Sequence, residues 1–314
     1  MNAYRYVYEI YKEKSFSKAA ANLYISQPAL SATIRKIESQ LGYQIFDRST
    51  SALRLTEAGT AYVEAAEQIL GIERDLERYV DDLTNLKSGH LVVSGTAFFS
   101  SYVLAPILRA FREQCPGIEL EFIEADSLKL YEQAMKNHID LIVDGGDYDR
   151  EHFDSHLLFR EHILLGIPAQ NPVNERFAGL ELTGEAVRRG EHLEARTEGI
   201  DLGELKGEEF VLLKRGHDLH RRAAELCGER GFSPKSAIHL NQLMTAVQIA
   251  AHGLGCVFLT DTLVARSWGS MPMKYYKLRT DRPELAVREV FIAHRKNCRM
   301  TRAMERFIAV GQSL

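Results

Sequence analysis

The stretch from Ser15 to Gly42, SFSKAAANLYISQPALSATIRKIESQLG, constrains the fold more than any other part of the 314-residue chain. We expect a first short helix from about Ser17 to Leu23, with Ser17 as its N-cap. A second helix then begins after Ser26, which caps it. Pro28 falls near the first position of that helix, where a missing N–H is tolerated. Two short helices that meet at a sharp turn predict a helix-turn-helix.

The second helix of this pair is amphipathic. Leu30, Ile34, Ile37 and Leu41 are spaced four, three and four residues apart, so we expect one apolar stripe to pack inward. The residues left outside are mostly short and polar: Gln27, Ala29, Ser31, Thr33 and Arg35. Short hydroxyl and amide side chains at the exposed start of a helix can enter the major groove of DNA and contact base edges. This helix is therefore our candidate recognition helix.

The segment after Gly42, YQIFDRSTSALRLTEAG, consists of two short apolar pieces separated by a polar turn from Ser49 to Ala52. This pattern predicts a two-stranded wing. Arg48 and Arg54 flank the turn, and basic groups at a wing tip are suited to the phosphates beside the groove that the recognition helix occupies.

Residues 1–88 resemble the winged helix-turn-helix and linker helix of LysR-type transcriptional regulators, with SFSKAAANL, ISQPALSATIRKIESQLG, IFDR and LTEAG in the family's order. The resemblance implies a regulator that binds double-stranded DNA at promoter operators. It also implies dimers that commonly pair into tetramers, with RNA polymerase as a further candidate partner. The DNA-contacting set would be the exposed residues named above together with Ser17, Ser26, Pro28, Arg48 and Arg54.

Two positions depart from the family's pattern. Ala32 stands where an arginine is frequent, and the wing tip reads Ser51-Ala52 where two basic residues are frequent. Each lost phosphate contact lowers the salt-dependence slope of binding by about one. We therefore expect weaker and less salt-dependent DNA binding than in a strongly basic relative.

A long helix is predicted from about Thr56 to Lys87. Its apolar positions alternate in steps of three and four, which is a heptad pattern. They are Tyr62, Ala65, Ile69, Ile72, Leu76, Tyr79, Leu83 and Leu86. We expect this seam to form a coiled-coil dimer, which places two recognition helices on neighbouring half-sites. The alternative is that the helix packs on its own domain.

Beyond Ser88-Gly89, strands and helices alternate, which predicts an α/β body with a parallel sheet. Two such sets follow each other, and the last strand and helix return to the first set in the family's effector domain and in periplasmic-binding-protein folds. We therefore expect a winged helix-turn-helix at 1–58, a linker helix at 59–88 and a two-lobed, periplasmic-binding-protein-like effector domain at 89–314. Lobe one would span about 89–162 and 268–314, and lobe two about 163–267.

Ligands in such architectures lie at the carboxyl ends of the strands, between the lobes. Free N–H groups and hydroxyls at helix starts favour small anions there. By resemblance, Thr96 and Ser127 would contact the effector from lobe one, and Gly216 and His217 from lobe two. Ala97, Phe98 and Phe99 make the site less polar, so we expect a small organic effector, an anion or an aromatic acid, and no cofactor. Helix capping is an equal reading for Thr96 and Ser127, and core packing a more frequent one for the two phenylalanines.

The segment from Asn171 to Lys206 is longer than its family counterpart, and its glycines and charges predict a surface insertion with a short helix near Glu185 to Gly190. The four cysteines are far apart, which favours buried thiols over a metal site or disulfides. No apolar run could span a bilayer and the N-terminus lacks a signal-peptide core, so we expect a cytoplasmic protein without membrane contact.

Three classes of function remain open at this stage. The sequence contains no His-x-x-x-His, Gly-x-Ser-x-Gly or strand-linked Gly-x-Gly-x-x-Gly pattern, so an enzyme is not favoured. The leading hypothesis is a sequence-specific transcriptional regulator that responds to a small molecule. The alternative is a constitutive DNA-binding regulator whose C-terminal domain only oligomerises.

Overall fold

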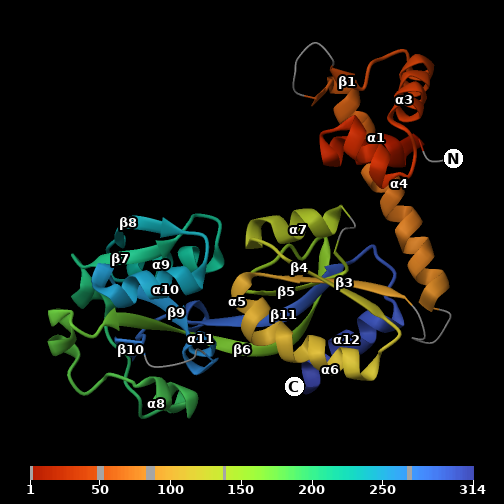
Figure 1. The fold of residues 1–314 in the computed structure, drawn as a ribbon. Coiled ribbons are helices and arrows are strands. Elements are labelled where there is room, and N and C mark those ends of the chain that lie inside the picture. The colour runs from red at the N-terminus through yellow and green to blue at the C-terminus, as the bar shows by residue number, and fades with distance from the viewer. Residues whose placement is uncertain (1–2, 48–52, 83–88, 137–138, 267–270) are drawn as a thin grey trace. The chain divides into compact units, whose positions relative to one another are not determined.

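The computed structural model describes residues 3–47, 53–82, 89–136, 139–266 and 271–314 (Figure 1). Within those ranges, side chains are not described for Asp75, Glu77, Arg78, Tyr79, Asp81, Asp82, Ser127 and Leu128. The chain forms two compact units, residues 1–85 with 135–138, and residues 86–134 with 139–314. Among the described residues, no helix is long and apolar enough to cross a membrane.

The N-terminal unit is a winged helix-turn-helix. It contains α1 (Ala3–Glu13), α2 (Phe16–Asn22), α3 (Gln27–Leu41), β1 (Phe46–Asp47) and β2 (Arg54–Leu55). The two wing strands are antiparallel, with Phe46 opposite Leu55. Buried side chains from α1, α2 and α3 form one core, which includes Val7, Ile10, Ala19, Leu30 and Ile34. The predicted helix-turn-helix and wing are therefore present.

The helix ends differ from the prediction in two places. Ser15, and not Ser17, is the N-cap of α2, because its side chain accepts a hydrogen bond from the Lys18 N–H. Ser26 caps α3 as expected and accepts from the Ala29 N–H at 3.4 Å. Leu41 does not join the buried stripe, because it lies in the last turn of α3 and is 45% exposed.

The linker helix α4 (Glu57–Asp82) begins one residue after its predicted start, because the Thr56 hydroxyl accepts the Gly59 N–H and so caps it. Its first turns pack on α1, where Tyr62 stacks on Tyr4 with ring centroids 5.5 Å apart and Val63 is buried. Tyr62, the first residue of the predicted seam, therefore packs inside its own unit, whereas Ala65 is exposed. The coiled-coil seam itself stays a prediction. Leu83 and Leu86 lie outside the described residues.

The first lobe of the C-terminal unit is built on a mixed sheet. The strands β3 (His90–Gly95), β4 (Glu119–Glu124) and β5 (Leu141–Gly145) are parallel, whereas β11 (Val287–Arg295) runs antiparallel to β5 and to β6 (Phe153–Pro168). An all-parallel sheet is thus the wrong expectation. The helices of this lobe are α5 (Ala97–Phe99), the π-helix η1 (Ser100–Leu104), α6 (Ala105–Gln114), α7 (Ser127–Met135) and α12 (Arg302–Ser313).

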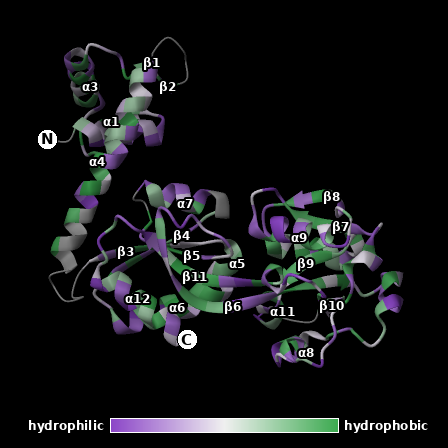
Figure 2. Ribbon diagram, turned by 180° about the vertical axis from the view of Figure 1, so that it is seen from behind, coloured by the Kyte–Doolittle hydropathy of each residue, from purple (hydrophilic) through white to green (hydrophobic). Residues whose placement is uncertain are grey.

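The second lobe continues from the far half of β6, which pairs with β9 (Val257–Thr260) and with β10 (Met273–Lys277). The strand β10 belongs to this lobe, so the chain returns to lobe one at β11 and not near residue 268 as predicted. The remaining elements are β7 (Glu209–Leu213), β8 (Lys235–Leu240), α9 (Asp218–Gly228), α10 (Leu243–Ile249), η5 (Ala250–Leu254), α11 (Asp261–Arg266) and η6 (Pro283–Leu285). The strands of both lobes are predominantly hydrophobic, and most helices alternate polar and apolar faces (Figure 2).

The inserted segment at 171–206 packs on the second lobe. It contains η2 (Pro172–Phe177), the expected short helix as α8 (Gly184–Arg188), η3 (Glu191–Leu193) and η4 (Leu202–Leu205). Single bridges tie Leu182 to Tyr275 and Ile200 to Leu278. Because its apolar residues, including Phe177 and Leu205, are buried in the main core, the segment is part of the lobe and not the surface insertion that the sequence predicts.

Candidate DNA-binding surface and effector cavity

The exposed start of α3 carries the candidate base-reading residues. Gln27 Nε2 donates to Ser31 Oγ at 3.0 Å, so the two side chains lie side by side on the helix surface. The Thr33 hydroxyl donates back to the Ala29 carbonyl at 2.9 Å, and Arg35 Nε donates to the Ser31 carbonyl. Gln27, Ser31 and Arg35 are spaced four residues apart and share one helix face, whereas Ala29 and Thr33 lie on another. All five lie outside the buried stripe, as expected. Their contacts with bases stay a prediction.

A buried carboxylate connects the recognition helix to the wing. Glu38 is 9% exposed, and its Oε1 accepts the Ile45 N–H at 2.9 Å and the Phe46 N–H at 3.3 Å. It therefore fixes the start of β1 relative to α3. The sequence analysis missed this role, because a glutamate beside the apolar stripe gives no sign that it is buried. Arg54 is exposed on β2, and Arg48 lies outside the described residues.

The second half of α4 presents apolar side chains to solvent. Ile72 is 67% exposed and Leu76 is 62% exposed, and Val80, four residues further on, is 55% exposed. A spacing of four places them on one helix face. Ile69 is partly buried, and the Tyr79 side chain is not described. An exposed apolar stripe of this kind is typical of a helix that packs on another chain.

A cavity of about 600 Å³ lies between the two lobes of the C-terminal unit. Lobe one lines it with the loop after β3, where Thr96, Ala97, Phe98 and Phe99 lie at the sheet's carboxyl edge. Lobe two lines it with Gly216 and His217 at the start of α9. The structure thus brings six of the seven predicted effector residues to one cavity. The seventh, Ser127, opens α7, and its side chain is not described.

Aromatic rings form part of the cavity wall. Phe98 and Phe99 are 5% and 3% exposed and pack edge to face with centroids 5.2 Å apart, so they belong to the core as well as to the wall. Tyr131 and Tyr148 line the same cavity. Thr96 precedes α5 without a side-chain capping bond, which leaves its hydroxyl available.

The charge of the lining is mainly negative. It includes the carboxyl groups of Glu124, Asp126, Asp144, Asp147, Asp149 and Asp218. Among the described lining residues the one arginine is Arg288, whose Nε donates to Glu161 at 2.6 Å and whose Nη1 lies 3.8 Å from Asp218. The anion or aromatic acid expected from the sequence stays a prediction, but the helix-start argument behind it took no account of the carboxylates from β4, β5 and α9.

Two buried groups of the lining are titratable. Burial raises the pKa of Asp144 to about 6, although the Gly145 N–H and Arg288 oppose the shift. Burial lowers the pKa of His217, against the attraction of Asp126. His217 is 7% exposed, and its Nε2 has no hydrogen-bond partner within the described residues. A buried polar atom without a partner on the wall of a cavity is suited to a ligand.

The geometry defines the class of protein: a helix-turn-helix head, a long helix and a two-lobed α/β domain that encloses a cavity. Residues 1–60 match the family described as bacterial regulatory helix-turn-helix protein, lysR family, and residues 84–313 match the LysR substrate binding domain. The chain belongs to the LysR family of transcriptional regulators.

Curated relatives and solved structures agree with this assignment. The HTH-type transcriptional regulator YcgK of Bacillus subtilis (strain 168) is 31% identical over 261 residues, which cover 83% of this chain and 79% of YcgK. A probable RuBisCO transcriptional regulator of Cyanidioschyzon merolae is 29% identical over 257 residues, with coverage of 81% and 79%. The fold is similar to full-length OxyR from Pseudomonas aeruginosa, with a TM-score of 0.70, 23% identity and coverage of 99% and 96%. It is also similar to full-length CbnR in complex with its target DNA, with a TM-score of 0.64, 17% identity and coverage of 99% and 98%.

Proposed function

We propose that this LysR-family regulator binds operator DNA through α3 and the wing, and that a small molecule in the cavity between the lobes controls its activity. The observation that carries the proposal is the cavity itself, because both lobes contribute to its wall and a bound molecule would contact both. A ligand with different affinity for two arrangements of the lobes shifts the population between them. The Ile72–Leu76 face of α4 would hold two such chains together, and RNA polymerase stays a candidate partner.

The effector carries a positive charge in this proposal. Asp144 is buried at the carboxyl end of β5, and Glu124 is exposed at the end of β4, with no side-chain hydrogen bond or ion pair within the described residues. A cationic amine would neutralise carboxylates that burial makes costly. Aromatic rings beside such carboxylates add cation–π attraction of about 0.5–2 kcal/mol. The lining therefore favours an amine with an apolar portion over a carboxylic acid.

His217 would contribute from the second lobe. Because burial lowers its pKa, its imidazole is neutral at pH 7 and does not repel a cation. Its unpartnered Nε2 can accept a hydrogen bond from an ammonium group or donate one to a hydroxyl, depending on the tautomer. A ligand that joined His217 to Asp144 would connect the two lobes.

Thermal unfolding with matched ligand pairs tests this proposal. Phenethylamine is compared with 3-phenylpropionate, and 1,4-diaminobutane with succinate, so that charge changes while size is kept. The amines are expected to raise the Tm, since a ligand that binds only the folded state stabilises it. The variant Asp144→Asn is expected to lose much of this effect, whereas the control Asp154→Asn, an exposed carboxylate outside the lining, keeps it.

Two outcomes would contradict the proposal. Stabilisation by carboxylates alone would refute the cationic effector and restore the anion expected from the sequence. Stabilisation by no member of a broad panel, with normal operator binding, would favour the constitutive regulator whose C-terminal domain only oligomerises.

A further inference from the structure

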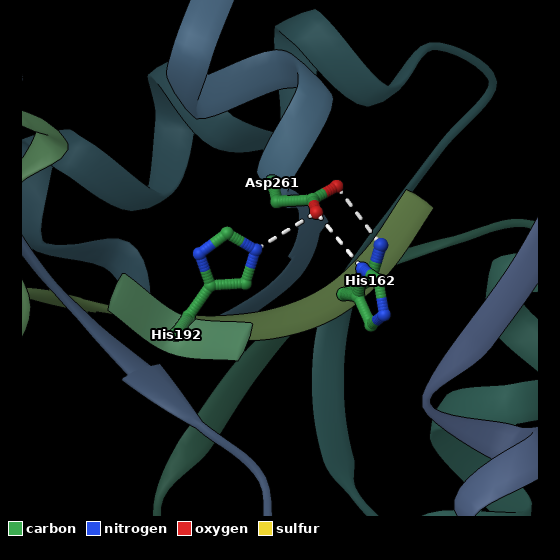
Figure 3. Close-up of side chains that lie close together, drawn as sticks. All are labelled: His162, His192 and Asp261. Atoms are coloured by element: carbon green, nitrogen blue, oxygen red, sulfur yellow. Dashed lines mark hydrogen bonds and ion pairs between the residues drawn. The ribbon is translucent and has the colours of Figure 1, made fainter. Parts of the chain in front are cut away.

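Three side chains from separate segments of the second lobe converge on one point outside the effector cavity (Figure 3). They are His162 from β6, His192 from η3 of the inserted segment, and Asp261 at the start of α11. Asp261 Oδ2 lies 3.1 Å from His162 Nδ1 and 2.9 Å from His192 Nε2. The donor atoms of all three residues lie within 4.8 Å of one another.

The carboxylate of Asp261 is held in a fixed orientation. Its second oxygen, Oδ1, accepts the backbone N–H groups of His162 at 2.9 Å and of Thr262 at 2.7 Å. The side chain is 13% exposed, and within the described residues its ion-pair partners are the two histidines, with no lysine or arginine. A largely buried carboxylate beside two imidazoles, which are neutral unless protonated, leaves a negative charge without a permanent countercharge.

We propose that His162, His192 and Asp261 bind a divalent transition metal, with Zn²⁺ as the best match. Two imidazoles and one carboxylate are a common three-ligand set for zinc, and the remaining tetrahedral position is left to water. Zn–N and Zn–O distances of about 2.0–2.2 Å require ligand atoms about 3.4 Å apart in a tetrahedron. The observed separations of 2.9 and 3.1 Å need only a small opening to admit the ion.

A hollow beside the three residues provides access. It has a volume of about 360 Å³, and His162 and His192 both line it. A water molecule occupies about 30 Å³ of liquid volume, so the hollow holds a fourth, water ligand with room to spare. The His162 side chain is 33% exposed, which gives the ion a path from solvent, whereas His192 is 4% exposed.

The metal would attach the inserted segment to the lobe. His192 is the one ligand that the segment at 171–206 supplies. The other two ligands come from β6 and α11, which lie outside this segment. The sequence gives no sign of this site, because the ligands stand 30 and 69 residues apart in the chain without any metal-binding spacing. The ion would thus be a structural clamp, independent of the effector cavity.

A second group of candidate ligands, Asp149, Glu151 and His152, differs in kind. All three are exposed and lie in one turn, where Asp149 already accepts the Glu151 N–H at 2.9 Å and pairs with His152 at 2.7 Å. We assign no site there. His152 is instead a useful control, because it measures adventitious binding by an exposed histidine.

The test is a Zn²⁺ titration of the full chain after chelator treatment, followed by calorimetry and by metal analysis of the desalted protein. We expect one Zn²⁺ per chain, lost in His192→Gln and in His162→Gln but retained in His152→Gln. Glutamine has an N–H that can donate to Asp261 but is a poor zinc ligand. These variants therefore keep a hydrogen bond to Asp261 while removing a metal ligand. The Zn²⁺ affinity of the two ligand variants is expected to fall by more than about tenfold. Loss of a residue that only supports a metal ligand already costs about 10–100-fold, so loss of a ligand should cost at least as much.

Limited proteolysis gives a readout that does not depend on DNA or effector. Zn²⁺ is expected to slow cleavage within 171–206 in the parent chain and to have no effect on His192→Gln. Circular dichroism confirms that each variant is folded before the titration. Equal Zn²⁺ affinity and stoichiometry in parent and His192→Gln, or no Zn²⁺ uptake by the parent, would overturn the proposal and leave a hydrogen-bond network alone.

Discussion

The ion pair between Arg288 and Glu161 supports the wall of the effector cavity and offers a quantitative test. Arg288 is 7% exposed and Glu161 is fully buried, with Nε and Oε1 separated by 2.6 Å. The second oxygen of Glu161 has no hydrogen-bond partner within the described residues. Removing the arginine would therefore leave a buried carboxylate without any cation.

The size of the effect follows from this burial. Breaking a buried pair by removing one partner costs about 3–5 kcal/mol, so Arg288→Met should lower the free energy of unfolding by that amount. For a unit of this size each kcal/mol shifts the Tm by roughly 2–4 °C, which gives a fall of about 6–20 °C. Replacing both partners, as in Glu161→Leu with Arg288→Met, should recover much of the loss, since a packed apolar pair leaves no unpaired charge.

Arg160→Met is the matched control for this experiment. Arg160 pairs with Glu289 at 3.0 Å on the same two strands, but the side chains are 61% and 46% exposed. Exposed pairs contribute about 0–1 kcal/mol. Calorimetric or denaturant unfolding of the full chain measures all the variants. A loss in Arg288→Met no larger than in Arg160→Met, or a double variant no more stable than the single one, would refute the reasoning.

Three further predictions concern assembly, pH and DNA. Leu76→Glu places like charges in the exposed stripe of α4, so the dimer and operator binding should be lost together. An unchanged mass in analytical ultracentrifugation would show that the stripe is not the dimer interface. Because the pKa of Asp144 is raised to about 6, its carboxyl group is mostly neutral below that pH. The affinity for an amine, measured by calorimetry, should therefore rise as the pH increases through 6. An affinity that did not change with pH would exclude Asp144 as the partner of the amine. Gln27→Ala should relax sequence preference by about 1–3 kcal/mol per lost base contact in selection assays, and unchanged preference would mean that α3 is not the reader.

Local patterns predicted the N-terminal unit well. Ser26 as a cap, Pro28 in the first turn and the buried positions Leu30, Ile34 and Ile37 depend on interactions within a few residues, which a sequence displays directly. The placement of Ser17 as a cap failed because Ser15, two residues earlier, is an equally good capping residue and accepts the Lys18 N–H.

Long-range pairing was less predictable. The strand β6 is 16 residues long and pairs with β11 in one lobe and with β9 and β10 in the other. The predicted lobe boundary at 162/163 therefore falls inside one continuous strand that joins both lobes. The acidic character of the cavity also comes from several segments, since Glu124 and Asp144 lie at the ends of different strands and Asp218 begins a helix. Thr96 and His217 were predicted from the family resemblance together with the rule that ligands lie at strand ends, and both line the cavity, but the charge around them required the fold.

The most direct test of the account is the affinity of the full chain for operator DNA, recovered from its own genome, with and without an amine that raises its Tm. We expect the amine to change DNA affinity, or the length of the protected site, with a coupling of about 1–3 kcal/mol, which is about 5–150-fold. The same amine should leave DNA binding by Asp144→Asn unchanged. An amine that binds the parent chain yet alters neither affinity nor protected site would contradict a ligand-responsive regulator.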